Sequence, residues 1–296
     1  MLIGAIVGAT GVGKTELSID IAKCLDVEII SMDSRQIYKG MPIGTAQPTQ
    51  VHRTRVKHHL VGFLEPTERY SVGKYIKAVE EIITANPGKK YLCVGGTGFY
   101  LKALQEGMSP LPEINLELRK RLENILKRKG LPFIYRWAQK NDPKGVEGVD
   151  TQNTHKIMRV LEVSLQAKQP YSELIKKKEG GWGTFPVLWL DLPREELYKR
   201  IEQRACEMIA MGWAEEAMGL AKKYGSQSPG LESLGYREII ANNGEINTEI
   251  TEKIIRTTRN YAKRQITWFK NQHKTLKKSP KSDFFGKKEE ILNFFT

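Results

Sequence analysis

Eight consecutive residues near the N-terminus have the types and the spacing of a phosphate-binding loop. The run Gly8-Ala9-Thr10-Gly11-Val12-Gly13-Lys14-Thr15 matches the pattern G-x-x-x-x-G-K-[ST], after an apolar segment and before one with helical spacing. Its glycines let successive backbone N–H groups converge on a phosphate, and the start of the following helix adds partial positive charge. We expect Lys14 to neutralise the terminal phosphates and the Thr15 hydroxyl to bind Mg²⁺. The pattern predicts a magnesium-bound diphosphate but leaves the reaction open.

Asp33 is the first candidate for acid–base chemistry. It lies just past a second apolar run, residues 27–31, and an ionised carboxylate there could take a proton from a nucleophile. Aspartate at the end of a strand also commonly caps a turn, and position alone does not separate these interpretations.

Other polar residues have structural interpretations beside functional ones. Arg200 and Arg204 are four residues apart on a predicted helix, a spacing that commonly gives surface ion pairs. The adjacent His58 and His59 do not face one side of a helix or strand, so we interpret them as structural rather than metal-binding. The run Gly95-Gly96-Thr97-Gly98 could be only a tight strand–helix turn.

The segments around these residues predict an α/β fold. Short apolar runs at 2–7, 27–31, 91–94 and 186–190 are candidate strands, and residues 16–25 and 72–84 have helical spacing. Such alternation is typical of a parallel sheet with helices on both faces, here in a P-loop NTPase-like arrangement. We therefore expect a catalytic core from residues 1–110 and 184–296.

Residues 111–183 have a different composition from the rest of the chain. The segment follows Ser109-Pro110-Leu111-Pro112, is rich in lysine and arginine, and has helical spacing around 118–126 and 154–166. We predict a mostly helical, basic insertion. A further helix is predicted at 251–272, with Arg256, Arg259, Lys263 and Lys270 on one face and an apolar face opposite.

The charge balance favours a polyanionic partner. Lysine and arginine exceed aspartate and glutamate by 47 − 34 = +13, which points to nucleic acid first and an acidic membrane second. Between residues 253 and 288 the basic residues are opposed only by Asp283. The chain has no apolar run of membrane-spanning length and no basic lead-in to a secretion signal. Its cysteines, Cys24, Cys93 and Cys206, are too far apart for a zinc or disulfide framework, so we expect a cytoplasmic protein.

Several ordered segments resemble the tRNA dimethylallyltransferase family, over residues 3 to about 272. The first three are Asp33-Ser34-Arg35-Gln36-Ile37-Tyr38, Gly44-Thr45-Ala46 and His58-His59-Leu60. The later ones, in the same order as in the family, are Tyr70-Ser71-Val72, Val94-Gly95-Gly96-Thr97-Gly98-Phe99-Tyr100-Leu101, Arg159-Val160-Leu161-Glu162-Val163, Arg200-Ile201-Glu202-Gln203-Arg204, Leu234-Gly235-Tyr236-Arg237-Glu238 and Ala262-Lys263-Arg264-Gln265-Ile266-Thr267-Trp268-Phe269.

The resemblance implies a reaction and the residues that carry it. It implies transfer of a dimethylallyl group from dimethylallyl diphosphate to N6 of the adenosine next to the anticodon, position 37, releasing pyrophosphate. Asp33 would be the general base and Thr10 would contact the bridging oxygen. Arg204, Lys14 and Mg²⁺ on Thr15 would stabilise the leaving group.

The resemblance also implies an interface for the tRNA anticodon stem-loop, on a protein that we expect to be a monomer. The implied RNA-binding residues are Asp33, Ser34, Arg35, Gln36, Thr97, Arg119, His155, Lys156, Arg159, Gly235, Tyr236, Arg237, Arg259 and Lys263. The chain departs from the family at His155-Lys156, where consecutive arginines are common, and at Gln47, where lysine is usual.

Three other functions remain open at this point. A small-molecule or nucleotide kinase would place ATP in the loop, although it gives no reason for the basic insertion. A transferase that prenylates free AMP or ADP would use the same chemistry without RNA. A non-catalytic RNA-binding protein would not need Lys14, Thr15 and Asp33.

Overall fold

The protein consists of two compact units. The computed structural model describes residues 1–113, 115–272, 277–280 and 288–296. One unit combines Met1–Gln105 with Thr184–Thr296, and the other is Glu106–Gly183, which contains the expected insertion 111–183. Each unit has hydrophobic core residues of its own.

The first unit is built on a parallel sheet, as predicted. Within the described residues the sheet has six strands in the order β3-β2-β4-β1-β5-β6, and every neighbouring pair is parallel. The strands are β1 (Leu2–Gly8), β2 (Glu28–Ser31), β3 (His58–His59), β4 (Tyr91–Gly95), β5 (Val187–Asp191) and β6 (Lys277–Pro280). Four of them coincide with the predicted apolar runs. The two edge strands, β3 and β6, were not predicted because neither is an apolar run.

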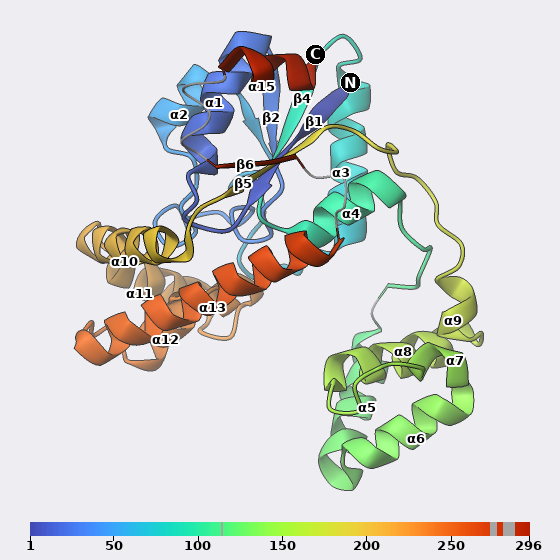
Figure 1. Ribbon diagram of the computed structural model, residues 1–296. Coiled ribbons are helices and arrows are strands. Elements are labelled where there is room, and N and C mark those ends of the chain that lie inside the picture. The colour runs from blue at the N-terminus through green and yellow to red at the C-terminus, as the bar shows by residue number, and fades with distance from the viewer. Residues whose placement is uncertain (114, 273–276, 281–287) are drawn as a thin grey trace. The chain divides into compact units, whose positions relative to one another are not determined.

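Helices cover both faces of the sheet, which confirms the predicted fold class. Helix α1 (Lys14–Leu25) and helix α3 (Val72–Ala85) lie on opposite sides of the strands (Figure 1). The remaining helices before the insertion are α2 (Gln50–Arg55) and α4 (Gly98–Glu106). Leu17 and Ile21 of α1 are buried because they lie on the face toward the sheet.

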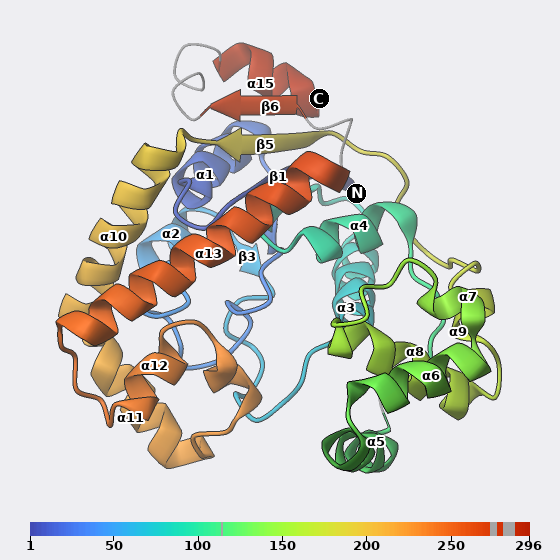
Figure 2. The same cartoon turned by 60° about the horizontal axis from the view of Figure 1, so that its bottom comes forward.

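A group of helices lies beyond the carboxyl ends of the strands. It comprises α10 (Arg194–Ala210), α11 (Trp213–Tyr224), the 3₁₀ turn η1 (Pro229–Glu232), α12 (Tyr236–Ala241) and α13 (Thr248–Gln272). The last helix of the chain, α15 (Lys288–Phe295), is not part of this group. Figure 2 shows α13 crossing in front of the strand ends with α10 beside it. The helix predicted at 251–272 is thus confirmed as α13. Ligands of parallel α/β proteins bind at this edge of the sheet, so these helices face the expected site.

Glycines allow the turn after β4 to approach its neighbours. A Cβ built on Gly95 would lie 2.0 Å from the carbonyl oxygen of Met32, and one on Gly98 would lie 2.2 Å from the Trp268 ring. Neither position has room for a side chain. The glycine-rich run is therefore required for packing against β2 and α13.

The second unit is helical, as predicted. It contains α5 (Leu116–Lys129), α6 (Leu131–Asn141), α7 (Pro143–Val146), α8 (Thr154–Ala167) and α9 (Tyr171–Leu174). Leu122, Ile134 and Leu161 form part of its core. The buried Asp142 carboxylate caps α7 by accepting from the Gly145 N–H at 2.9 Å, and it also accepts from the Ser172 hydroxyl at 2.6 Å.

Two expectations from composition, on membrane-spanning segments and on the basic run near the C-terminus, can be compared with the described residues alone. No helix in the described part of the chain is long and apolar enough to cross a bilayer. Of the basic run that begins at Lys253, Lys274, Lys281 and Lys287 lie outside the described residues, as does Asp283.

Candidate active site

The phosphate-binding loop has the expected strand–turn–helix context. It leaves β1 at Gly8 and enters α1 at Lys14, with Gly11 and Gly13 at φ values of 84° and 94°, which only glycine adopts readily. The Lys14 ammonium donates to the carbonyl oxygens of Gly8 at 3.0 Å and Ala9 at 2.9 Å. Burial lowers the pKa of Lys14 to about 8, Asp33 opposes that change, and Arg204 adds to it. A bound anion would raise the pKa of Lys14 again, because it stabilises the charged ammonium.

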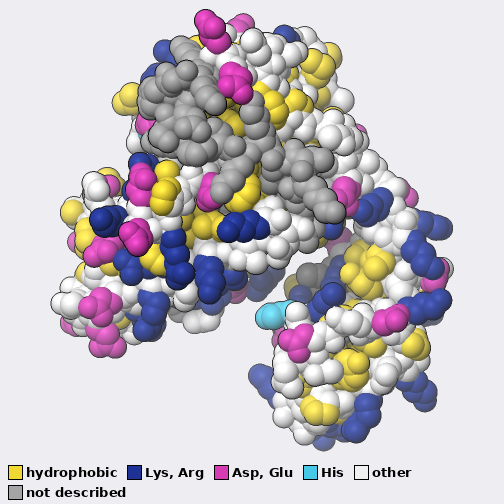
Figure 3. Space-filling view, viewed as in Figure 1, with side chains coloured by type: hydrophobic (Ala, Val, Ile, Leu, Met, Phe, Trp, Pro, Cys, Tyr) yellow, Lys and Arg dark blue, Asp and Glu magenta, His cyan; other side chains and the backbone are white. Residues whose placement is uncertain are grey.

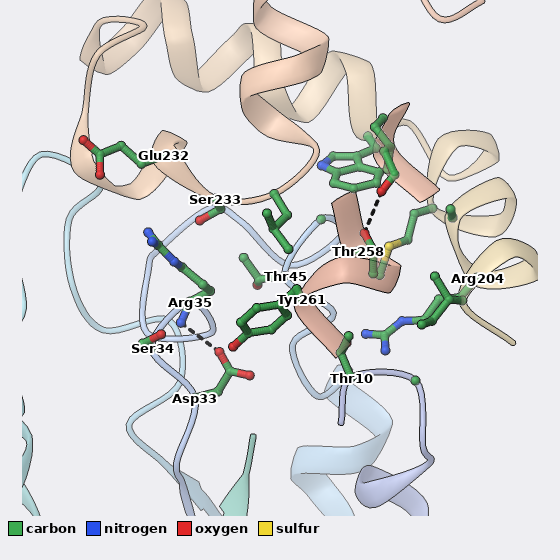
Figure 4. Close-up of a pocket in the computed structure, with 18 of the residues that line it drawn as sticks. Thr10, Asp33, Ser34, Arg35, Thr45, Arg204, Glu232, Ser233, Thr258 and Tyr261 are labelled. Carbon is green, nitrogen blue, oxygen red and sulfur yellow. Dashed lines mark hydrogen bonds between the residues drawn. The ribbon is translucent and has the colours of Figure 1, made fainter. Parts of the chain in front are cut away.

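Asp33 forms the turn that the sequence suggested, and its geometry is compatible with the acid–base role that the sequence left open. Its Oδ1 accepts from the backbone N–H of Arg35 at 2.8 Å and of Gln36 at 3.3 Å, which forms a turn at the end of β2 (Figure 4). In the described part of the chain its Oδ2 accepts no hydrogen bond from the protein. The turn therefore fixes the orientation of the carboxylate and leaves one oxygen available for proton transfer.

The residues around Asp33 are held by side chains from neighbouring segments. The Thr97 hydroxyl accepts from the Ser34 N–H at 3.1 Å, so it holds the turn rather than lying free. The Gln36 amide donates to the carbonyl oxygen of Ala46 at 2.8 Å. Gln47 is buried and its amide donates to the Tyr38 carbonyl at 2.7 Å, which gives the glutamine at this position a structural role.

A cavity of about 260 Å³ lies between the loop, the Asp33 turn and the helices at the carboxyl edge. All its lining residues belong to the first unit, and Figure 4 shows most of them. They are Thr10, Gly11, Asp33, Ser34, Arg35, Gly44, Thr45, Ile201, Arg204, Ala205, Met208, Trp213, Glu232, Ser233, Leu234, Ile254, Thr258, Tyr261 and Arg264. The cavity brings together the three expected catalytic residues, Thr10, Asp33 and Arg204.

Arg204 contributes the cation opposite Asp33. It projects from α10 into the cavity, and Thr10 lies between it and Asp33 in Figure 4. Burial lowers the pKa of Arg204, and the Asp33 carboxylate counteracts this shift. Arg200, one turn earlier, instead forms a surface ion pair with Glu196 at 2.6 Å. The ion-pair interpretation is confirmed for Arg200, whereas Arg204 faces the cavity.

Helix α13 supplies cavity residues that the sequence reasoning missed. Thr258, Tyr261 and Arg264 line the cavity, and the Tyr261 hydroxyl lies toward Asp33 (Figure 4). The pKa of Tyr261 is raised by burial first and by Asp33 second. A spacing of three residues places these side chains on one face of a helix, so the sequence could have indicated them. The sequence analysis instead interpreted this helix by its basic residues, as an RNA-binding element.

Gln265 ties α13 to the phosphate-binding loop. Its side chain is 7% exposed, its Oε1 accepts from the Thr10 N–H at 2.9 Å, and its Nε2 donates to the Gly96 carbonyl at 2.9 Å. One amide thus connects the loop, the turn after β4 and α13. This connection orients the α13 residues that line the cavity.

Tyr236 was expected to bind RNA, but the structure places it in the protein interior. It is fully buried, its hydroxyl donates to Glu216 Oε1 at 2.5 Å, and burial raises its pKa. A Cβ on Gly235 would lie 2.1 Å from the Trp213 ring. Gly235 and Tyr236 therefore pack against Trp213 and cannot form an RNA-facing surface in this conformation, whereas the Arg237 side chain is 62% exposed.

The two expected basic residues of α13 differ in their surroundings. Arg259 donates to Glu202 at 2.9 Å and lies 5.0 Å from the Tyr198 ring centroid, whereas Lys263 is exposed. Figure 3 shows lysine and arginine side chains gathered over the region of α10 and α13. Lys263 is therefore freer than Arg259 to meet a phosphate.

The other expected RNA-binding residues belong to the second unit. Arg159 pairs with the buried Glu162 at 3.1 Å, and the Arg119 Nε lies 3.9 Å from the same carboxylate. His155 and Lys156 are exposed at the start of α8. This unit thus carries its own set of arginines, oriented by one acidic side chain.

The adjacent histidines have structural roles, as interpreted. His59 Nε2 lies 2.6 Å from Glu28 Oε2, and His58 Nδ1 lies 2.7 Å from the Val56 carbonyl oxygen. Within the described ranges no three histidine, cysteine or acidic side chains cluster as they would around a metal ion.

Comparisons with known proteins give one consistent result. The family model described as IPP transferase matches residues 36–272, and one described as Isopentenyl transferase matches residues 1–59. A protein of Fusobacterium nucleatum named tRNA dimethylallyltransferase is 41% identical over 268 residues, covering 90% of this chain and 87% of that protein. One of the same name from Francisella philomiragia is 38% identical over 303 residues, covering 99% and 98%.

Solved structures agree with these sequence relatives. The full-length tRNA isopentenylpyrophosphate transferase from Bacillus halodurans aligns with a TM-score of 0.68 at 32% identity. The alignment covers 99% of this chain and 94% of that one. The similarity therefore includes both compact units.

Proposed function

The chain belongs to the tRNA dimethylallyltransferase (IPP transferase) family, and we propose that it transfers a dimethylallyl group from dimethylallyl diphosphate to tRNA. The acceptor is N6 of the adenosine next to the anticodon, at position 37. The observation that carries this proposal is the cavity that joins Thr10 of the phosphate-binding loop, Asp33 and Arg204. It offers a diphosphate site and a base within one chain, which supports a protein active as a monomer.

Asp33 acts as the general base. The adenine amine is a weak nucleophile because its lone pair is conjugated with the ring, so its proton must leave as the new bond forms. The N6–C1 bond forms, the C1–oxygen bond breaks, and pyrophosphate departs with the bonding electrons. The N6 proton passes to the carboxylate of Asp33, whose Oδ2 is not used by the turn.

Cationic groups and backbone amides stabilise the leaving pyrophosphate. Lys14 and the loop N–H groups contact its phosphates, Thr10 contacts the bridging oxygen, and Arg204 approaches from α10. The full set of diphosphate-binding residues is Gly8, Ala9, Thr10, Gly11, Val12, Gly13, Lys14 and Thr15. These charges act where negative charge develops, so they lower the barrier more than they strengthen ground-state binding.

The residues present fit a magnesium ion shared with the diphosphate. Mg²⁺ typically keeps several waters and takes one or two protein oxygens together with phosphate oxygens. The Thr15 hydroxyl, at the first turn of α1, supplies such an oxygen without a cluster of carboxylates. When bound, the ion supplies further neutralisation of the diphosphate charge.

The basic surfaces hold the anticodon stem-loop. The exposed Lys156 in the second unit and the exposed Lys263 on α13 contact phosphates and position the RNA, and Arg119 and Arg159, which Glu162 orients, add to the basic surface of the second unit. The target adenine leaves the loop stack to reach Asp33, as in other enzymes that modify a base. With tRNA as the acceptor, we place the activity in the cytoplasm.

The test is pyrophosphate release by the full-length protein with Mg²⁺. Dimethylallyl diphosphate with unmodified tRNA is compared with dimethylallyl diphosphate plus AMP, and with ATP alone. Release that requires both the prenyl donor and tRNA supports the proposal. Release with AMP would make the protein a free-nucleotide transferase. ADP formation without use of the prenyl donor would favour a kinase and overturn the proposal.

A further inference from the structure

One face of α10 forms a cavity wall whose chemistry changes along its length. Ile201, Arg204, Ala205 and Met208 all line the cavity, and their spacing places them on one helical face. Ile201 lies at the phosphate-binding loop, because a Cβ built on Gly11 would be 3.2 Å from its Cγ1. Met208 lies about 10 Å further along the helix axis, at about 1.5 Å per residue. The wall runs from the loop, past Arg204, to an apolar end.

The apolar end is closed by side chains from three helices. Met208 of α10, Trp213 of α11 and Ile254 of α13 line the cavity and are 8%, 3% and 1% exposed. A ligand with an anionic head and a short hydrocarbon tail matches this gradient, with its head at the loop and its tail against these three side chains. Burial of the tail there removes apolar surface from water.

We propose that Met208 limits the length of the prenyl chain, so that a five-carbon dimethylallyl tail is accepted and a ten-carbon geranyl tail is excluded. The inference rests on the proposed function of the same site. Because Met208, Trp213 and Ile254 close the apolar end of the cavity, a second isoprene unit would have to displace one of these buried side chains. Met208 is the long, unbranched apolar side chain of the wall, and it lies one helical turn beyond Arg204.

The experiment compares two donors in wild-type protein and in two variants of one helix. The donors are dimethylallyl diphosphate and geranyl diphosphate, with the same tRNA and Mg²⁺, and kcat/KM is measured for each. The test variant is Met208→Ala. The matched control is Met211→Ala, because Met211 is the C-cap residue just after the same helix, is 61% exposed and does not line the cavity.

The expected result is a change in the ratio of the two donors. Wild-type protein prefers dimethylallyl over geranyl diphosphate by at least about 100-fold. Met208→Ala raises kcat/KM for geranyl diphosphate by at least about tenfold and lowers it for dimethylallyl diphosphate by less than tenfold. Met211→Ala leaves the ratio at the wild-type value. A purely structural role of Met208 would lower both values together.

A stability control and a second variant distinguish a failure of the Met208 proposal from a failure to fold. Met208 also packs in a hydrophobic cluster, so the melting temperature is recorded, and Met208→Val is tested if Met208→Ala does not fold. Geranyl use equal to dimethylallyl use in wild type, or no gain in either Met208 variant, would overturn the assignment of Met208. Absence of dimethylallyl transfer in wild type would instead refute the proposed function itself.

Discussion

Replacing Asp33 with asparagine separates the charge of this residue from its place in the fold. The asparagine carbonyl oxygen can accept the same two bonds that Oδ1 accepts, from Arg35 N–H at 2.8 Å and Gln36 N–H at 3.3 Å. The turn at the end of β2 is therefore retained, whereas the ability to take a proton is lost. Asp33→Ala removes both properties.

The expected magnitudes follow from these contacts. Loss of a general base lowers the rate by about 10² to 10⁴-fold, or about 3 to 6 kcal/mol in the activation barrier at about 1.4 kcal/mol per decade. Asp33→Asn should show this loss with little change in the free energy of unfolding. Asp33→Ala should show the same rate loss and a free energy of unfolding lower by about 1 to 3 kcal/mol, because two hydrogen bonds disappear.

The assay is single-turnover formation of dimethylallyl-adenosine in tRNA, with enzyme in excess, since this isolates chemistry from product release. Urea denaturation measures stability, and a filter-binding titration confirms that tRNA affinity is retained. Asp20→Asn is the matched control, because Asp20 is 41% exposed and its carboxylate pairs with Arg55 on the surface, at 3.0 Å. Turnover of Asp33→Asn within tenfold of wild type would refute the role of Asp33 as the base.

Three further predictions concern the loop and the basic surface. The KM for dimethylallyl diphosphate should rise as pH increases through about 8, because the Lys14 pKa is lowered to about 8 and the neutral amine attracts no anion; a constant KM between about pH 7 and pH 10 would contradict this. Gln265→Ala leaves the Thr10 N–H and the Gly96 carbonyl without their partner, so urea denaturation should show a loss of about 2 kcal/mol or more, and an unchanged midpoint would refute the bridge. Lys263→Ala should reduce the slope of log Kd for tRNA against log salt by about one, and Arg259→Ala by less because Arg259 is already paired at 2.9 Å. Equal slopes in these two variants would contradict that difference.

Local features were predictable because they depend on neighbouring residues. The strand–turn–helix of the phosphate-binding loop requires glycines at fixed positions, and those positions are visible in the chain. The apolar runs that become β1, β2, β4 and β5 bury both faces, so their composition alone identifies them. The edge strand β3 consists of His58–His59, and its pairing with β2 is decided by tertiary contacts.

The family and the α/β fold class could thus be recognised from the sequence, together with Thr10, Asp33 and Arg204 as candidate residues. The cavity could not, because its walls come from segments far apart in the chain. Gln265 and Thr10 are 255 positions apart, yet their hydrogen bond orients Tyr261 and its neighbours on α13. Tyr236 illustrates the same limit, since its motif suggested RNA contact and only packing against Trp213 shows that it is buried. Backbone conformation is set by short-range sterics, whereas side-chain burial is set by which elements pack together.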